Sequence, residues 1–188
     1  MKPLSSDDLR ELGVAEVGER VFVDATARLI NPGQLRIGSD VRIDAFAVLS
    51  AGDGGIVIGD HVHIAAHVFL AGTGSITIAD FAGLSGRVSI YSSNDDYSGD
   101  HLTGPTVPMD LRGVTTADVL IGRHAIIGAG SVVLPGVRIG DGSAVGALSL
   151  VNADVAGFTT VAGTPARVIG TRSKGMLALE QQLRDRQP

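Results

Sequence analysis

The chain has 188 residues, of which 44% are hydrophobic and 4% aromatic, and it contains no Cys. Its formal net charge of −5 argues against a nucleic-acid partner. No segment has the apolar length that a membrane-spanning helix needs, so we expect no membrane insertion. The absence of Cys excludes disulfides and fits a cytoplasmic protein. The length suits a single domain over residues 1–188.

The N-terminal segment, residues 1–13, is predicted to hold a short helix. Ser5 or Ser6 can cap its first turn, and Gly13 can end it. Leu9 and Leu12 lie at positions from which they would pack on the structure that follows.

An aliphatic residue recurs every six positions from residue 17 to residue 151. Extra residues are inserted only after every third member of the series, which predicts three units per closed turn and therefore a triangular prism of parallel coils. An antiparallel sandwich would not keep a strict step of six. The pattern predicts a parallel β-helix with four coils over 14–90 and further coils over 119–170. The members are Val17, Val23, Leu29, Ile37, Ile43, Leu49, Ile58, Ile64, Leu70, Ile78, Leu84, Ile90, Ile121, Ile127, Val133, Ile139, Val145 and Val151.

The remaining positions of the six-residue unit agree with this prediction. Small or β-branched residues such as Ala47 and Ala125 stand two positions before the aliphatic residue and can share the interior. Glycine often follows the aliphatic residue, as at Gly38 and Gly128, where we expect the chain to turn a corner.

Residues 91–118 interrupt the repeat. They are rich in Ser, Asp, Gly and Pro and must leave the prism as a loop. Long loops in compact proteins are usually functional or disordered. A smooth prism has no cleft of its own, so we expect a pocket between two chains, with the loop reaching across, in a homotrimer.

The C-terminal part of the chain is predicted to close the prism. Residues 155–169 fit a partial last coil. Residues 174–186 fit a helix whose apolar residues, Met176, Leu177, Leu179 and Leu183, would cap the exposed end.

Two segments, together with the repeat and its loop, carry a resemblance to a known family. One runs from Ile121 to Val133 as IGRHAIIGAGSVV, and the other from Ala162 to Ile169 as AGTPARVI. Over residues 14–170 the chain resembles the hexapeptide-repeat acyltransferases, and most of all the galactoside and maltose O-acetyltransferases and the sugar acetyltransferases of surface-polysaccharide pathways. The resemblance implies a left-handed β-helix and a homotrimer.

The resemblance also implies acetyl-CoA as co-substrate and no metal. By position, Ala129 and Ala147 match the residues whose backbone meets the pantetheine and thioester, and Arg167 matches the basic residue that meets the CoA phosphates. The Lys that often follows the last full repeat is replaced by the segment 152–154. Phosphate binding is therefore expected to use Arg167, Arg172 and Lys174. A purely structural role for the two alanines in coil packing is an equally good interpretation.

Acyl transfer needs a base for the acceptor's proton and a donor for the developing oxyanion. The galactoside and maltose enzymes place a His in the loop, but Asp95 stands at the matching position here. We therefore propose His63, which precedes Ile64 and so points outward, as the base. Asp95 or Asp96 would orient its imidazole from the same or a neighbouring chain.

Other residues complete the list of candidates. His67 and His101 are alternative bases, whereas His61 and His124 fall at corners, where we expect them to be solvated and without a role. Asn94 and Tyr97 in the loop, with His67, are candidates for binding the acceptor, a sugar or nucleotide-sugar.

Two other functions stay open at this point. A carbonic-anhydrase-like β-helix holds zinc with three His, but the spacing of His63 and His67 does not match that class. A non-catalytic assembly platform would explain the missing loop His. The predicted reaction is acetyl transfer from acetyl-CoA to a hydroxyl or amine of a sugar or nucleotide-sugar, in surface-polysaccharide biosynthesis.

Overall fold

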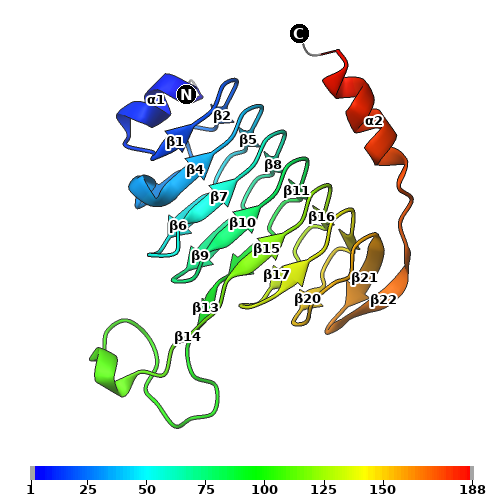
Figure 1. The fold of residues 1–188 in the computed structure, drawn as a ribbon. Coiled ribbons are helices and arrows are strands. Elements are labelled where there is room, and N and C mark those ends of the chain that lie inside the picture. The colour runs from blue at the N-terminus through cyan, green and yellow to red at the C-terminus, as the bar shows by residue number, and fades with distance from the viewer. Residues whose placement is uncertain (1–2, 187–188) are drawn as a thin grey trace.

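The computed structural model describes residues 3–186, and these form a left-handed parallel β-helix of about seven coils (Figure 1). Short strands of successive coils stack into three parallel faces, which confirms the predicted prism. The first face consists of β1 (Glu16–Val17), β4 (Leu35–Ile37), β7 (Ile56–Ile58), β10 (Ile76–Ile78), β15 (Val119–Ile121) and β18 (Arg138–Ile139).

The other two faces follow the same order along the chain. The second face consists of β2 (Phe22–Val23), β5 (Arg42–Ile43), β8 (His63–Ile64), β11 (Gly83–Leu84), β16 (Ile126–Ile127), β19 (Ala144–Val145), β21 (Thr159–Gly163) and β22 (Ala166–Thr171). The third face consists of β3 (Arg28–Ile30), β6 (Val48–Ala51), β9 (Phe69–Gly72), β12 (Ser89–Tyr91), β17 (Val132–Val133) and β20 (Leu150–Val151).

The aliphatic residues of the six-residue repeat fill the prism. Sixteen of the eighteen are buried, and the other two, Val17 and Leu29 of the first coil, pack against the core while partly exposed. Small residues share the interior as predicted, among them Ala47 and Ala125. The pattern of six therefore identifies the core almost completely.

We expected glycine after these aliphatic residues because the chain turns a corner there, but the structure gives a different reason. A Cβ on Gly128 would lie 2.5 Å from the Ala147 nitrogen of the next coil, so the site needs glycine because two backbones approach closely. The left-handed backbone of the corner falls two positions after the glycine position, on residues such as His67 (φ 61°) and Arg87 (φ 62°).

Three edges join the faces, and we name each by what lies on it. The helix edge, between the first and second faces, carries His61, Phe81 and His124. The groove edge, between the second and third, carries His67, Arg87 and Leu148. The loop edge, between the third and first, releases residues 92–118 after β12. The base of this loop is a two-stranded antiparallel ribbon of β13 (Ser93–Asn94) and β14 (Thr115–Thr116).

Two α-helices and two 3₁₀ turns complete the described chain. The predicted N-terminal helix is α1 (Ser6–Glu11), capped by Ser5 in a capping box with Asp8. The 3₁₀ turns are η1 (Pro32–Gln34) and η2 (Met109–Leu111). No helix within residues 3–186 has the length and apolar character needed to cross a bilayer.

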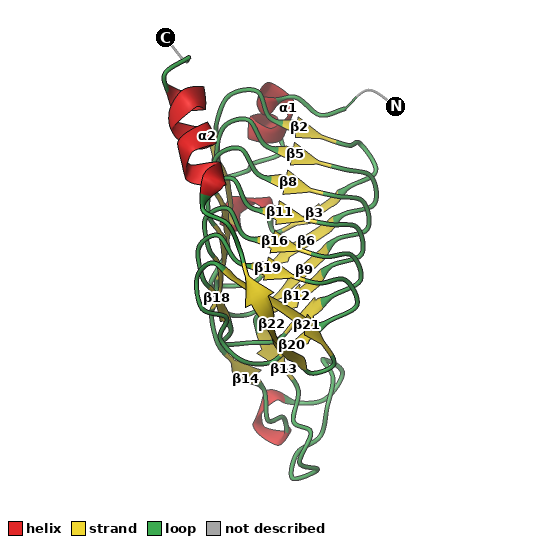
Figure 2. Ribbon diagram, turned by 90° about the vertical axis from the view of Figure 1, so that its right-hand side faces the viewer, coloured by secondary structure: helices red, strands yellow, loops and turns green. Residues whose placement is uncertain are grey.

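The predicted role of the C-terminal helix is wrong. The helix, α2 (Gly175–Arg184), lies along the helix edge beside earlier coils rather than across the end of the prism (Figure 2). The end is covered instead by β22, which folds back antiparallel on β21. A ribbon that pairs with the last strand satisfies its exposed N–H and C=O groups, which a helix cannot do.

Candidate active site

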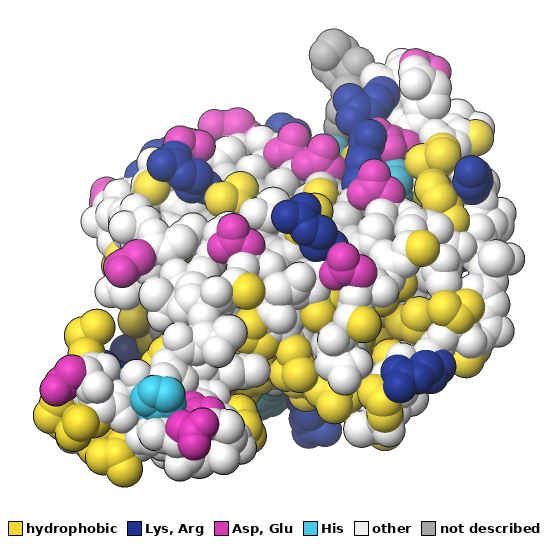
Figure 3. Space-filling model, turned by 60° about the horizontal axis from the view of Figure 1, so that its bottom comes forward, with side chains coloured by type: hydrophobic (Ala, Val, Ile, Leu, Met, Phe, Trp, Pro, Cys, Tyr) yellow, Lys and Arg dark blue, Asp and Glu magenta, His cyan; other side chains and the backbone are white. Residues whose placement is uncertain are grey.

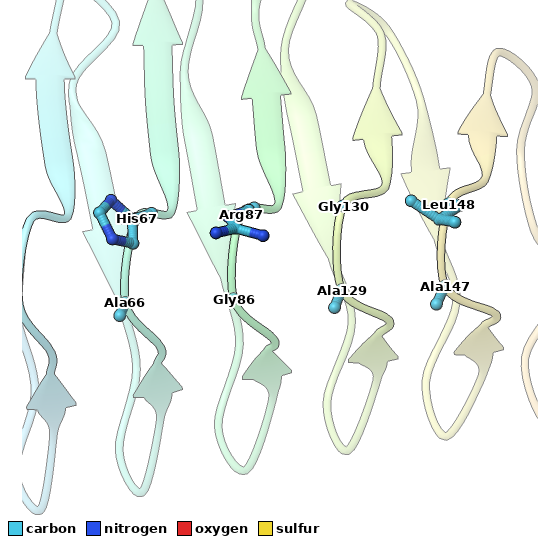
Figure 4. A pocket seen from close by; sticks show the side chains of 8 residues that line it. All are labelled: Ala66, His67, Gly86, Arg87, Ala129, Gly130, Ala147 and Leu148. Atoms are coloured by element: carbon cyan, nitrogen blue, oxygen red, sulfur yellow. The ribbon is translucent and has the colours of Figure 1, made fainter.

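A groove runs along the groove edge across four successive coils (Figure 4). It has a volume of about 520 Å³, and its lining is mostly apolar. The structure thus brings three predicted site residues, His67, Ala129 and Ala147, into one depression. The lining residues are Ala66, His67, Gly86, Arg87, Ala129, Gly130, Ala147 and Leu148.

The floor of this groove presents unpaired backbone donors. The N–H groups on either side of Ala129 are used, because Gly128 donates to the Val145 carbonyl and Gly130 to the Gly86 carbonyl. Within residues 3–186, the N–H groups of Ala129 and Ala147 themselves have no partner, and the same holds for Ala66 and Gly86. Unpaired amides in a row suit a ligand that carries several carbonyl oxygens.

The helix edge shows why these amides stay free. At its equivalent corner positions, aspartates of the next coil accept the N–H groups: Asp60 accepts from Ser39 at 2.7 Å, and Asp80 accepts from Asp60 at 2.9 Å. The groove edge has only alanine or glycine at these positions, so no side-chain acceptor is available. The residue type at this corner position, often Asp at the helix edge and Ala or Gly at the groove edge, therefore distinguishes the two edges.

His63 lies on the outer face of β8, beside the groove. Its Nε2 is 2.8 Å from an Asp44 Oδ2 in the preceding coil, and its side chain is 54% exposed. A second hollow of about 250 Å³, which we call the notch, opens in front of it. The notch and the groove share Gly86 as a wall. The notch is lined by His63, Ala65, Gly83, Leu84, Ser85, Gly86 and Ile126.

The Asp44 carboxylate determines which nitrogen of His63 can act as a base. Burial alone would raise the pKa of Asp44, but hydrogen bonds from His63 and Arg42 outweigh burial and leave that pKa below its usual value. An ionised carboxylate only accepts hydrogen bonds, so Nε2 of a neutral His63 ring carries the hydrogen. The lone pair then lies on Nδ1, which is the nitrogen available to take a proton.

The loop residues lie on another side of the molecule. Asp95 is exposed, and Tyr97 has 90% of its surface exposed, while Asn94 pairs with Thr115 in the ribbon at the base of the loop. Asp96 accepts hydrogen bonds from Ser98 and His101, which lower the pKa of its carboxyl far below the usual value.

Within one chain, the predicted orienting pair is therefore not formed. The loop leaves at the loop edge, which is opposite the face that carries His63. Among the described residues, the acid that contacts the His63 ring is Asp44. Figure 3 shows the loop as a protrusion at lower left, with acidic and His side chains beside exposed hydrophobic ones. Those exposed hydrophobic residues include Tyr97, Leu102, Met109, Leu111 and Val114.

The cations proposed for phosphate binding separate into two groups. Arg167 is exposed on β22, opposite Ala162 and just beyond the Leu148 end of the groove. Arg172 is turned toward the coils, and its Nη1 donates to the carbonyls of His124, Gly142 and Ser143. These bonds tie the chain after β22 to two coils, and a role of Arg172 in phosphate binding stays a prediction. Lys174 lies 4.8 Å from the Phe158 ring centroid.

The expectation that His124 is solvated is wrong. Its ring stacks on Phe81, which stacks in turn on His61, and its Nε2 lies 2.7 Å from the Glu180 carboxylate of α2. Burial, followed by the charges of Arg123 and Arg172, lowers the pKa of His124. The lowered pKa favours the neutral ring, whose Nε2 contacts the Glu180 carboxylate and so links α2 to the coils.

Two polar residues of this site were not among the predicted ones. Asp44 and Ser85 both directly follow an inner aliphatic residue at the groove edge, where later coils have Gly128 and Gly146. A polar residue at a position that otherwise favours glycine could have identified both as candidate site residues. No group of three or more His, Cys, Asp or Glu suited to a metal ion occurs in residues 3–186.

Comparison with known proteins agrees with this geometry. The family model "Bacterial transferase hexapeptide (six repeats)" matches residues 118–153. The dTDP-4-amino-4,6-dideoxy-D-glucose acyltransferase of Escherichia coli is 46% identical over 180 residues, which cover 96% of this chain and 94% of that protein.

Solved structures of AntD, an N-acyltransferase from Bacillus cereus, are similar along nearly the whole chain. The complex with dTDP and 3-hydroxybutyryl-CoA has a TM-score of 0.92 at 39% identity and covers 98% of both chains. The complex of a serine variant with dTDP-4-amino-4,6-dideoxyglucose and coenzyme A has a TM-score of 0.92 at 38% identity, covering 98% of this chain and 97% of that one. Fold, groove and relatives agree, and the chain belongs to the hexapeptide-repeat acyltransferases, in the branch that acts on sugars and nucleotide-sugars.

Proposed function

We propose that this acyltransferase moves an acyl group from acyl-CoA to the 4-amino group of a dTDP-4-amino-4,6-dideoxyhexose. The observation that carries the proposal is the row of unpaired N–H groups at Ala66, Gly86, Ala129 and Ala147, which ends beside His63. Pantetheine carries two amide carbonyls and a terminal thioester, so it matches a row of donors along an apolar groove. The relatives named above supply the choice of acceptor.

In the proposed reaction, the acceptor nitrogen attacks the thioester carbon. The C–N bond forms, the C–S bond breaks, and the oxyanion of the intermediate accepts a hydrogen bond from a groove N–H such as that of Gly86. His63 Nδ1 takes the proton from the nitrogen and passes it to the departing thiolate. Asp44 holds the ring through Nε2 and stabilises the imidazolium. Arg167, exposed on β22 beyond the Leu148 end of the groove, would meet the phosphates of CoA.

The proposal also includes a homotrimer whose active sites lie between chains. Exposed apolar side chains on the loop suit a partner surface, and the loop leaves opposite the His63 face of its own chain, so it would meet a neighbour's groove. Asp95, Asp96, Asn94 and Tyr97 would then orient the amino sugar from the adjacent chain. We place the enzyme in the cytoplasm, which the absence of Cys supports.

A thiol-release assay tests the proposed reaction. Acetyl-CoA and 3-hydroxybutyryl-CoA would be offered with dTDP-4-amino-4,6-dideoxyglucose, and with dTDP-glucose as the acceptor that lacks the amine. We expect turnover with the amino sugar alone, reduced about a hundredfold or more in His63→Gln. His61→Gln, in the same coil but on the helix edge, is the matched control. Release that requires no amine, or that survives His63→Gln, contradicts the proposal.

A further inference from the structure

A glycine interrupts the outward column of side chains on the second face. The register pairs Arg42 with His63, His63 with Gly83, and Gly83 with Ile126. Leu84 points inward and is buried, so Gly83 faces outward. The missing side chain opens the notch between an imidazole and an exposed isoleucine.

The backbone does not require glycine at this position. A Cβ built on Gly83 meets no atom within 4 Å, and the φ angle of Gly83 is not in the left-handed region. By contrast, a Cβ on Gly128, at a corner of the next coil, would collide with Ala147. Glycine weakens a strand and often marks the close approach of a ligand. The free space at Gly83 is therefore a property of the site rather than of the fold.

The notch lies where the end of a thioester would arrive. The groove passes Ala147 and Ala129 and reaches Gly86, which lines both hollows. If the groove holds acyl-CoA, as proposed above, the group at the end of the donor enters the notch. The walls from Ala65, Leu84 and Ile126 are apolar, and His63 and Ser85 bring polar groups.

We propose that the notch is the acyl pocket and that Gly83 sets the acyl length, so that the enzyme accepts donors longer than acetyl. An acetyl group has three heavy atoms and a 3-hydroxybutyryl group has six. A hollow of about 250 Å³ corresponds to about eight waters at roughly 30 Å³ each, which leaves ample room for the larger group. Apolar walls suit the carbon chain, and the polar groups of His63 and Ser85 suit a hydroxyl on it.

Filling the notch tests the inference, which rests on the proposed function. Gly83→Ala adds a Cβ that meets no atom within 4 Å, and Gly83→Val adds a β-branched side chain of a kind that strands favour. Gly33→Ala is the matched control, because its Cβ would also meet only ordinary contact, far from the groove edge. Values of kcat/KM would be measured with acetyl-CoA, butyryl-CoA and 3-hydroxybutyryl-CoA, all with dTDP-4-amino-4,6-dideoxyglucose.

We expect the ratio of four-carbon to acetyl kcat/KM to fall about tenfold or more in Gly83→Val, less in Gly83→Ala, and not in Gly33→Ala. An unchanged ratio, an equal loss for all donors, or a wild type that refuses both four-carbon donors overturns the acyl-pocket assignment while the transferase reaction stands. Absence of thiol release with every donor overturns the proposed function, and the acyl-pocket assignment with it.

Discussion

The residue pair that defines the candidate site, Asp44 and His63, joins two coils through one hydrogen bond. The two residues are 19 positions apart, and they meet because the register of adjacent coils sets His63 beside Arg42, two residues before Asp44. Asp44 also accepts from Arg42 at 2.7 Å. The carboxylate is only 22% exposed, so these contacts act partly away from solvent.

This pairing predicts how stability depends on pH. The folded-state pKa of Asp44 lies below its unfolded value of about 3.9. The ionised carboxylate therefore adds to the free energy of unfolding above that pH, and this stabilisation is lost as the pH falls through the folded-state pKa. We expect Asp44→Asn to lower the Tm by about 2–4 °C at pH 6, equivalent to about 1 kcal/mol, and by clearly less at pH 3. Thermal unfolding at both pH values measures this difference.

The exposed turn residue Asp53 offers a matched control. Asp53→Asn should leave the Tm nearly unchanged at both pH values, since surface substitutions have small effects. A loss of Tm in Asp44→Asn that is the same at pH 6 and pH 3 would show that the carboxylate's charge does not stabilise the fold.

The sequence predicts correctly whether a residue points inward or outward when that residue belongs to the six-residue repeat. The outward position of His63 follows from the inward position of Ile64, and the small corner residues at the groove edge follow from the step of six. The partner of His63 does not follow, because the contact depends on side-chain reach between coils. The same holds for Arg172, because a basic residue near the end of the chain gives no sign that its Nη1 donates to three carbonyls.

At the scale of elements, α2 is held on the helix edge by a buried carboxylate. Glu180 is 8% exposed and pairs with His124, Arg123 and Arg184. The apolar residues of the helix are less buried than this acid, because Leu179 remains 64% exposed. Apolar periodicity predicts that the helix exists, but its position depends on an ion-pair cluster, which periodicity does not report.

Removing this carboxylate should release the helix. Glu180→Ala leaves Arg123 and His124 without their common partner, and breaking a buried pair of this kind costs about 3–5 kcal/mol. We expect faster amide hydrogen exchange throughout α2 while the coils keep their protection. Gln182→Ala, two positions away and exposed, should leave exchange as in the wild type. Unchanged protection of α2 in Glu180→Ala would mean that its apolar contacts hold it alone.

At the scale of the whole molecule, a triangular cross-section constrains where a complete site can form. The loop leaves between the third and first faces, and His63 stands on the second, so the prism separates them. A second chain that packs its groove edge against the loop edge of the first brings them together. In the proposed homotrimer the same contact would repeat around a threefold axis, and every chain would give one loop and one groove.

Mixing two variants of strongly reduced activity tests this arrangement. His63→Ala chains keep Asp95, and Asp95→Ala chains keep His63, so the proposed homotrimer, assembled from both, would hold sites with both residues intact. Random assembly of equal amounts places an intact His63 beside a neighbour's intact Asp95 in about a quarter of the sites. We therefore expect co-refolded mixtures to regain about a quarter of the wild-type thiol release, although each variant alone is much slower.

The control replaces the Asp95→Ala partner by a chain that carries both substitutions. Such a mixture contains no His63 at all and should regain nothing, whatever the geometry. If His63 and Asp95 of the same chain formed the site, every chain in the first mixture would lack one of the two, and its activity would equal that of the separate variants. Recovery of activity therefore requires sites that are shared between chains. We expect such sites because the fold of one chain keeps its loop and its His63 on opposite sides of the prism.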